Sequence, residues 1–523
     1  MAQKLPLGVQ TFEEIIRHGY VYVDKTTLIH QLANGGKYFF LSRPRRFGKS
    51  LLLSTLEAYF TGRRDLFHGL AMEQLESEWE SYPVLRLDLN SGNYTGGVEE
   101  LNDRIAKFLD TYERAYNLPQ EGMSFGTRFG CLIQNIYDKT GKQVVFLVDE
   151  YDKPLIANVE KEMEALQAQQ REILKAFYGN VKTMDPCIRF AMFTGVSRFS
   201  HVSVFSDLNN LTDISLDDRF SAICGITEQE LHHYLDEDVA ELAARCKITK
   251  AEAYESLKHY YDGFRFSDEG VELYNPWSLF KALTMQRFGT YWYQSGTPSF
   301  LIKMIRDGQL DLTKMDGNII TNEETMMTFE SDTNVVAPLY QTGYLTIKDC
   351  IIRPRRFPVY KLGFPNLEVE TAFSSHLLPV YTSIRTDQVF PLANAINEAA
   401  QAGDVDTLLT TVRGILAEAP VESNDERVIE LNYRNLIAIA LRMSGLDCHI
   451  EQATSAGRID LALEADDFVY VMEFKRTSLD DAARQIETRR YADRYLNDPR
   501  TVIKVAVALD DTVRNIASWQ VFA

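Results

Sequence analysis

Three consecutive residues, Gly48, Lys49 and Ser50, have the types that bind the phosphates of a nucleotide. The apolar run 38–41 before them predicts a short buried strand, and the apolar residues after Ser50 recur at helical spacing. The glycine lets the backbone approach an anion, the lysine reaches the terminal phosphates, and the serine hydroxyl is placed to bind Mg²⁺. Arg43 replaces the first glycine of the usual motif, and a chance Gly-Lys-Ser in a loop is the alternative interpretation.

Two later segments end in side chains that would complete such a site. The apolar run 144–148 predicts a strand covered on both faces, and it is followed by Asp149 and Glu150. We expect Asp149 to hold Mg²⁺ through water and Glu150 to orient and polarise the attacking water. A third predicted strand ends at Thr194, whose hydroxyl would contact the γ-phosphate or that water. Each strand alone is also compatible with a buried strand that ends in a helix cap, but the three in this order predict ATP binding.

The second set of candidate residues, Asp460, Glu473 and Lys475, lies near the C-terminus. Two segments of alternating polarity flank Asp466 and Asp467, which predicts a β-hairpin. If these two aspartates form the turn, Asp460 lies directly opposite Glu473, with Lys475 on the same face. Two carboxylates and an ammonium suit metal-dependent hydrolysis of a phosphodiester. The alternative is a surface charge ladder, although like charges placed opposite each other destabilise a sheet.

Length and composition limit the class of protein. The chain has 523 residues, 45% hydrophobic and 25% charged, which is ordinary for a soluble protein of three or four domains. Because the net charge is −19, any nucleic acid must bind in a local basic groove. The six scattered cysteines predict neither a zinc site nor a disulfide framework. The N-terminus reads as polar helix and no apolar run has membrane-spanning length, so we expect a cytoplasmic protein that binds no membrane.

The rest of the sequence predicts the elements around these residues. The alternating run Tyr20–Thr26 reads as a strand and is expected to wall the nucleotide base. A capping box over Thr227–Glu230 starts a helical region, and the segment 339–347 reads as a further strand. The pentapeptide Arg-Pro-Arg-Arg-Phe occurs at 43–47 and again at 353–357, which we treat as coincidence. The second copy is a candidate basic hairpin, with a solvated turn as the alternative.

Five strings resemble the AAA-ATPase-like family of bacterial proteins that carry a C-terminal PD-(D/E)XK nuclease-like domain: Tyr22-Val-Asp-Lys-Thr26, Leu41-Ser-Arg-Pro-Arg-Arg-Phe-Gly-Lys-Ser50, Val148-Asp-Glu-Tyr-Asp-Lys-Pro154, Phe193-Thr-Gly-Val-Ser-Arg198 and Tyr274-Asn-Pro-Trp277. The resemblance spans nearly the whole chain. In similar proteins the arginine-rich loop is the norm, so Arg43 does not by itself imply an inactive site.

The resemblance also implies roles for individual residues. It implies that Glu430 is an additional acidic metal ligand and Gln485 an active-site glutamine of the nuclease-like domain. In the ATPase domain it implies further nucleotide contacts by Arg45, Arg46 and Arg198. One departure is the segment 488–490, which lacks a lysine that similar proteins commonly have there. That departure concerns a phosphate contact more than metal binding.

We therefore predict an α/β protein with a P-loop ATPase sheet, a helical lid, a winged-helix-like region and a small α/β PD-(D/E)XK nuclease-like domain. The expected boundaries are 1–225, 226–300, 301–385 and 386–523, the last including a helical linker. The predicted cofactors are ATP with Mg²⁺ at the first site and Mg²⁺ or Mn²⁺ at the second. The predicted function is an ATP-regulated nuclease acting on DNA or RNA. The alternative is a nucleotide-dependent switch or scaffold, with an inactive nuclease fold, that binds a protein partner or another copy of itself.

Overall fold

The computed structural model describes residues 4–118, 122–198, 204–205, 208, 210–292, 301, 304–305, 310–328, 335–420, 426–454, 457–476, 478–510 and 515–522. The chain divides into two compact units. The first comprises Met1–Tyr291, Asn322–Ile347 and Arg353–Pro358. The second comprises Trp292–Thr321, Lys348–Ile352 and Val359–Ala523. The four-part division expected from the sequence stays a prediction.

The first unit is built on a parallel sheet of five strands in the order β2-β3-β4-β1-β5. The strands are β1 (Tyr38–Ser42), β2 (Val84–Asp88), β3 (Val144–Asp149), β4 (Ile188–Gly195) and β5 (Thr212–Asp213). All residues of β1 and β3 are buried, as expected for strands covered on both faces. Because β4 lies between β1 and β3, the carboxyl ends of these three strands meet at one edge of the sheet.

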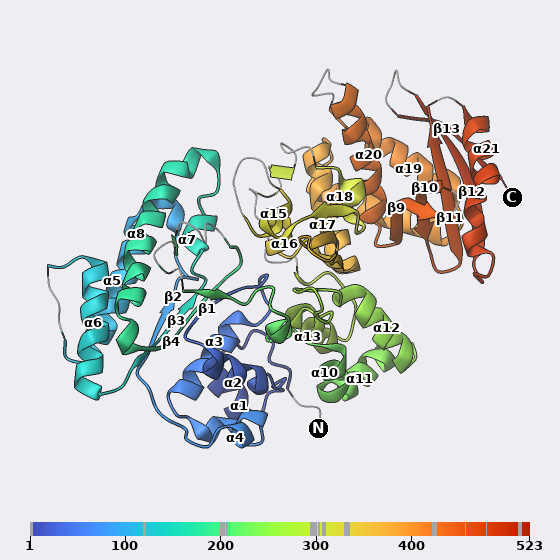
Figure 1. Ribbon diagram of the computed structural model, residues 1–523. Helices are drawn as coiled ribbons and strands as arrows, with labels where there is room; N and C mark the ends of the chain where they lie inside the picture. The colour runs from blue at the N-terminus through green and yellow to red at the C-terminus, as the bar shows by residue number, and fades with distance from the viewer. Residues whose placement is uncertain are drawn as a thin grey trace. The chain divides into compact units, whose positions relative to one another are not determined.

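Helices cover this sheet on both faces (Figure 1). The helices of this part are α1 (Phe12–Arg17), α2 (Thr26–Gly35), α3 (Lys49–Phe60), α4 (Ala71–Leu75), α5 (Glu99–Ala115), α6 (Phe125–Thr140), α7 (Lys153–Ile156) and α8 (Glu164–Thr183). Helix α3 packs against β3 and β4, and α6 packs against β3. Phe129, Phe146 and Phe177 form one aromatic cluster that joins α6 and α8 to the sheet.

A helical region follows the sheet. Its helices are α10 (Glu228–Tyr234), α11 (Asp236–Cys246), α12 (Lys250–Tyr261) and α13 (Pro276–Met285), and the predicted capping box at Thr227 and Glu230 is confirmed. Val21 packs into the core of this region with Leu231 and Leu257. The predicted strand over Tyr20–Thr26 is wrong, because Tyr20 makes only an isolated bridge to Lys4. Val21 is buried among helices rather than beside a neighbouring strand.

A three-stranded sheet in the order β6-β8-β7 forms the next part of the chain. It comprises β6 (Ile319–Thr321), β7 (Thr346–Ile351) and β8 (Val359–Gly363), with α15 (Glu323–Met327) and α16 (Val336–Gln341) between β6 and β7. The strand predicted over 339–347 is therefore wrong in its first half, which ends a helix. Gly343 has φ 89°, a left-handed conformation that breaks the chain between α16 and β7.

The C-terminal part is a mixed sheet of five strands in the order β13-β12-β11-β10-β9. The strands are β9 (Asp447–Thr454), β10 (Gly457–Glu464), β11 (Phe468–Lys475), β12 (Thr501–Asp510) and β13 (Asn515–Phe522). Strands β11 and β12 are parallel, and the other neighbours are antiparallel. This sheet and the parallel sheet of the first unit confirm the predicted α/β class.

Helices flank the C-terminal sheet. They are α17 (Leu367–Tyr381), α18 (Thr386–Gln401), α19 (Val405–Ala417), α20 (Glu426–Arg442) and α21 (Leu479–Arg489). Figure 1 shows α19 and α21 on opposite sides of this sheet, and α21 packs against β11 and β12. Val469, Val471 and Ile486 share one core cluster, so α21 covers the face of β11 that carries the odd-numbered residues. None of the helices that the structure describes is both long and apolar enough to span a bilayer.

Candidate active sites

The loop between β1 and α3 places a buried lysine at the edge of the parallel sheet. Gly48 has φ 98° and caps α3, so a helix N-terminus points at the loop. The Lys49 side chain is 3% exposed, and its Nζ donates to the carbonyl oxygens of Arg43 at 3.0 Å and Pro44 at 3.3 Å. Its Nζ also lies 3.2 Å from Oε1 of Glu150. An ammonium held in this way beside a helix N-terminus suits the terminal phosphates of a nucleotide.

Arg43, which replaces the usual glycine of the motif, is directed into the protein. It is 1% exposed, and its guanidinium donates to the carbonyl oxygens of Ser42 at 2.9 Å and Ser215 at 2.8 Å. The guanidinium also stacks on the ring of Phe266 at 4.3 Å. Arg43 therefore braces the loop from behind and does not fill the space where phosphate would bind, which explains how the loop tolerates the substitution.

Three polar residues meet at the carboxyl ends of the strands. The Thr194 hydroxyl donates to Oδ1 of Asp149 at 2.9 Å, and β4 places it between the phosphate loop and β3. Burial raises the pKa of Asp149, while its hydrogen bond with the Ser50 hydroxyl acts in the opposite direction. The predicted Mg²⁺ ligands Ser50 and Asp149 are thus in contact, and their oxygen atoms are the donor type that Mg²⁺ prefers. Glu150 follows with a left-handed backbone, φ 52°.

Two further residues that the sequence analysis missed support this edge of the sheet. Asp152 is fully buried and accepts hydrogen bonds from the backbone N–H groups of Val196, at 3.1 Å, and Ser197, at 2.6 Å. Burial raises its pKa to about 6, and the hydrogen bonds from Ser197 oppose that rise. Arg86 on β2 places Nη2 3.9 Å from Oδ2 of Asp149. Asp152 lies within the family-like string Val148–Pro154, and Arg86 interrupts an apolar strand, so both left a signal in the sequence.

Two of the three arginines expected at the nucleotide, Arg46 and Arg198, have other partners in this structure, and Arg45 lies near Lys153. The guanidinium of Arg46 stacks on the Trp277 ring at 3.9 Å and donates to the carbonyl of Tyr291 at 3.2 Å. Nε of Arg198 lies 2.6 Å from Oδ2 of Asp213. Burial lowers the pKa of Lys153, and the nearby charge of Arg45 lowers it further. Nucleotide contacts of Arg45, Arg46 and Arg198 therefore stay predictions.

An apolar hollow of about 90 Å³ adjoins the phosphate loop at Gly48. The segment before the loop contributes to it, as does the helical region, and the lining includes Tyr22, Val23, Ile223, Gly225, Ile226, Pro276 and Phe280. Its lining is mostly apolar, as in small-molecule sites. The segment around Tyr22 thus lines an apolar hollow beside the loop, where it was expected to wall the base.

The C-terminal hairpin has the register predicted from the sequence. Leu461 pairs with Met472, and the N–H of Ala465 donates to the carbonyl of Phe468 at 2.8 Å, so Asp466 and Asp467 form the turn. The same register places Asp460 opposite Glu473 on one face of the sheet. Oδ2 of Asp460 accepts the Phe474 N–H at 2.9 Å, and Nζ of Lys475 donates to Oε1 of Glu473 at 2.7 Å.

Both carboxyl groups of the pair have raised pKa values, and Glu473 is buried while Asp460 is half-buried. Glu473 is 0% exposed, and burial together with the charge of Asp460 raises its pKa to about 7. Burial also raises the pKa of Asp460. Burial disfavours the charge of Lys475, but its hydrogen bond to Glu473 and the charges of both carboxylates outweigh this, so its pKa is raised.

The donor set fits a divalent cation. Oε2 of Glu473 is buried and no N–H or hydroxyl group donates to it, so the oxygen is satisfied by a proton shared with the Asp460 carboxyl or by a cation that replaces this proton. Among the residues that the structure describes, no three His, Cys, Asp or Glu side chains cluster to form a complete protein cage. Mg²⁺ commonly binds through one or two carboxylates and keeps several waters or substrate oxygens, so two carboxylates are sufficient.

Comparison with known proteins assigns an N-terminal and a C-terminal part of the chain. A family model described as "Predicted AAA-ATPase" matches residues 6–205, and a model of the PD-(D/E)XK nuclease superfamily matches residues 428–519. The chain is also 35% identical over 505 residues to the "Uncharacterized protein in vnfD 5'region" of Azotobacter chroococcum mcd 1, covering 94% of each chain. The protein belongs to the AAA-ATPase-like family with a C-terminal PD-(D/E)XK nuclease-superfamily domain. The resemblance inferred from its motifs is confirmed.

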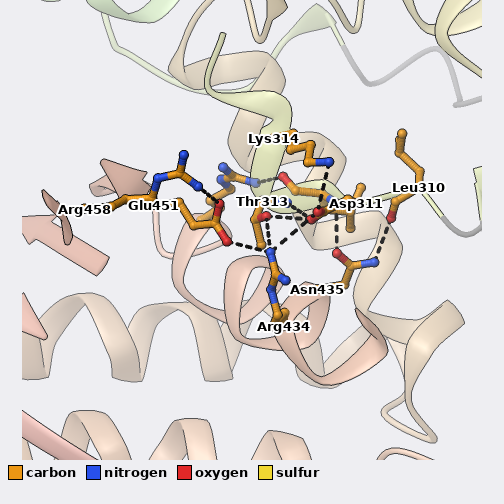
Figure 2. A network of polar contacts seen from close by, with 10 residues as sticks. Leu310, Asp311, Thr313, Lys314, Arg434, Asn435, Glu451 and Arg458 are labelled. Atoms are coloured by element: carbon orange, nitrogen blue, oxygen red, sulfur yellow. Dashed lines mark hydrogen bonds and ion pairs between the residues drawn. The ribbon is translucent and has the colours of Figure 1, made fainter. Parts of the chain in front are cut away.

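The nuclease-superfamily domain contains a third carboxylate close to the hairpin, Glu451 on β9. It occupies the register position beside Asp460, and its charge contributes to the raised pKa of Asp460. Figure 2 shows Glu451 between two arginines: Nη2 of Arg434 lies 2.6 Å from Oε1, and Nη1 of Arg458 lies 2.8 Å from Oε2. Arg434 also lies 3.5 Å from Oδ2 of Asp311. Arg434 and Arg458 thus engage one oxygen each of the Glu451 carboxylate in this structure.

The last two predicted residues of this domain lie on flanking helices. Nε2 of Gln485, on α21, donates to the Tyr491 hydroxyl at 3.3 Å. Tyr491 lies near Lys475 and against Gly457 of β10, so it connects Gln485 to the hairpin. The sequence analysis missed Tyr491 because it follows the left-handed residue Arg490, beyond the end of α21. Glu430 lies on α20, and its side chain is outside the described part of the structure.

Proposed function

We propose that this protein binds and hydrolyses ATP at the loop 43–50 and couples its nucleotide state to metal-dependent cleavage of DNA or RNA at the C-terminal hairpin. The observation that carries the proposal is the pairing of Asp460 with Glu473 beside Lys475, with one buried carboxylate oxygen to which no N–H or hydroxyl group donates. Two carboxylates placed opposite each other, one of them buried, are costly when the single ammonium of Lys475 is all that balances them. Membership of the two families supports both activities in outline.

At the ATPase site, the loop N–H groups and Lys49 would bind the phosphates, with the base in the apolar hollow beside Gly48. Ser50 and Asp149 would hold Mg²⁺ there, and the ion would neutralise charge on the phosphates. Glu150 lies within reach of the terminal phosphate position, because it is paired with Lys49 at 3.2 Å. Its carboxylate would orient the attacking water.

At the hairpin, Asp460 and Glu473 would hold Mg²⁺ or Mn²⁺. The cation, when bound, would activate a water and stabilise the charge that develops on the phosphate. Lys475 would contribute a second positive charge at the phosphate, while Gln485, held by the Tyr491 hydroxyl, would position the water or the substrate. The raised pKa values of both carboxyl groups indicate that cation binding displaces a proton.

The decisive experiment incubates the full-length protein with ATP, Mg²⁺ or Mn²⁺, and a panel of single- and double-stranded DNA and RNA. We expect cutting that requires the metal and is lost in Asp460→Ala. Asp466→Ala is the matched control, since it changes an exposed aspartate in the turn of the same hairpin. Wild-type protein that binds ATP but cuts none of the substrates with either metal would refute the nuclease and favour the switch or scaffold.

A further inference from the structure

The turn that joins β7 to β8 presents three arginines and a phenylalanine to solvent. Arg353, Arg355, Arg356 and Phe357 are all exposed, and Phe357 is 90% exposed. The turn has a defined backbone, because the N–H of Arg356 donates to the carbonyl of Arg353 at 3.1 Å and Arg355 has φ 61°. Within the described chain, no hydrogen bond or ion pair engages the side chains of these arginines. Ile352, the residue before Arg353, is 61% exposed and adds apolar surface, so the turn combines accessible apolar and cationic groups.

The charge of this hairpin is opposite to that of the whole protein. Five basic residues and one acidic residue lie between Thr346 and Gly363, whereas the chain carries a net charge of −19. The acidic residue, Asp349, is already paired with Lys361 at 2.9 Å. We call residues 353–357 the arginine tip. No other carboxylate lies within the hairpin sequence to balance the charges of its three arginines. Such a local surface attracts a polyanion.

Helix α16, which precedes the hairpin, is neither charged nor exposed. Helix α16 has the sequence Val-Ala-Pro-Leu-Tyr-Gln, which contains no charge, and its residues from Ala337 to Gln341 are buried. It therefore has no face for reading base edges in a groove. Of the two elements, only the arginine tip is accessible and basic. Contacts made by it alone would be to the backbone and would be independent of sequence.

We propose that the arginine tip binds nucleic acid, with Arg353, Arg355 and Arg356 on phosphates and the Phe357 ring stacked on an unpaired base. The choice of nucleic acid as the polyanion rests on the proposed nuclease function. Two features of the tip favour it over an acidic protein surface. The planar guanidinium matches phosphate oxygens in a bidentate way, and an exposed aromatic ring beside cations is the combination that binds single strands without sequence preference.

The test measures binding without cutting. Full-length protein is titrated in EDTA against fluorescent single-stranded and duplex oligonucleotides of mixed sequence, over a range of salt concentrations. The triple variant Arg353→Ser, Arg355→Ser and Arg356→Ser is expected to bind weakly to both. Loss of three phosphate contacts makes the slope of log affinity against log salt shallower by about 2 for single strands. Phe357→Ala is expected to lose about five-fold or more in single-strand affinity, with no change in slope.

The control variant removes the same number of arginine charges from other positions on the surface. Arg64, Arg114 and Arg245 are exposed arginines of the first unit, and their replacement by serine should leave affinity and slope close to the wild-type values. A tip variant that binds like this control would overturn the proposal, as would wild-type protein that binds no oligonucleotide. Unchanged single-strand affinity in Phe357→Ala would overturn the stacking contact.

The same proteins separate this inference from the proposed nuclease. Wild-type protein that binds through the arginine tip and cuts nothing with Mg²⁺ or Mn²⁺ would refute the nuclease and leave the tip assigned. A tip variant that binds and cuts as the wild type does would refute the tip and leave the nuclease standing.

Discussion

Replacing Glu473 by glutamine should stabilise the protein at neutral pH while it abolishes metal binding. Glu473 is 0% exposed and lies opposite Asp460, so its charge is costly in the metal-free protein. Its pKa is raised from an ordinary value of 4.5 to about 7, which corresponds to about 3 kcal/mol of lost stability above pH 7 at about 1.4 kcal/mol per tenfold in proton affinity. The neutral amide of glutamine avoids this cost and retains most of the shape.

The pH dependence has a definite sign. Because the folded-state pKa of Glu473 lies above its unfolded value, the folded protein holds an additional proton between about pH 4.5 and about pH 7. The free energy of unfolding of the wild type therefore falls as the pH rises through this window, and the decrease is complete above it. Glu473→Gln lacks this decrease, so its advantage over the wild type should be absent at pH 4 and fully present at pH 8.

Thermal unfolding in EDTA measures the effect. A gain of about 3 kcal/mol corresponds to roughly 6–12 °C in Tm for a unit of this size. Mg²⁺ at about 100 times its Kd should restore about 2.7 kcal/mol to the wild type and nothing to Glu473→Gln. Glu487→Gln is the control, since Glu487 is an exposed glutamate of α21 paired with Lys504. The reasoning would be refuted if Glu473→Gln were less stable than the wild type at pH 8. It would also be refuted if the Tm difference between the two proteins were the same at pH 4 and pH 8.

Three further predictions concern the ATPase domain. Lys49→Ala should abolish ATP binding measured by calorimetry while the far-UV circular dichroism spectrum is retained. The control Lys250→Ala, at an exposed lysine, should bind ATP normally. Retained ATP affinity in Lys49→Ala would refute the assignment of the phosphate loop. Glu150→Gln should keep its ATP affinity and lose about 10²–10⁴-fold in turnover, with Glu160→Gln as the control, and a wild-type rate would make Glu150 merely structural. Arg43→Ala should lower the free energy of unfolding by about 3 kcal/mol, because buried carbonyl oxygens lose their donor. Arg45→Ala should cost much less, and equal losses would contradict the bracing role of Arg43.

The features that the sequence predicted well are those set by neighbouring residues. The register of the C-terminal hairpin follows from its two-residue turn and alternating pattern, so the pairing of Asp460 with Glu473 can be predicted from local sequence alone. The strands before Ser42 and Asp149 are equally predictable, since a parallel strand covered on both faces is apolar throughout.

The features that the sequence did not predict depend on distant partners. Asp152 acts on the turn after β4 through hydrogen bonds to residues more than forty positions away. Tyr20–Thr26 has the residue types of a strand, but Val21 is buried by helices that follow two hundred residues later. Arg46 and Arg198 have the charge to bind phosphate, yet Trp277 and Asp213 engage them in this structure. Residue type gives the capacity for a contact, and the fold decides which partner is within reach.

The repeated pentapeptide Arg-Pro-Arg-Arg-Phe isolates that effect of context. At 43–47 its first arginine is buried, with carbonyl acceptors supplied by Ser42 and Ser215, and Phe47 is 1% exposed. At 353–357 the same residues lie on a hairpin turn in solvent. Burying the first copy is favourable only because the fold supplies acceptors and the Phe266 ring, since a guanidinium moved from water to the interior without partners is strongly destabilising. The second copy lies where no such set of acceptors surrounds it, so its charges stay in water. Identical local sequence thus serves as an internal brace in one place and as a candidate binding surface in the other.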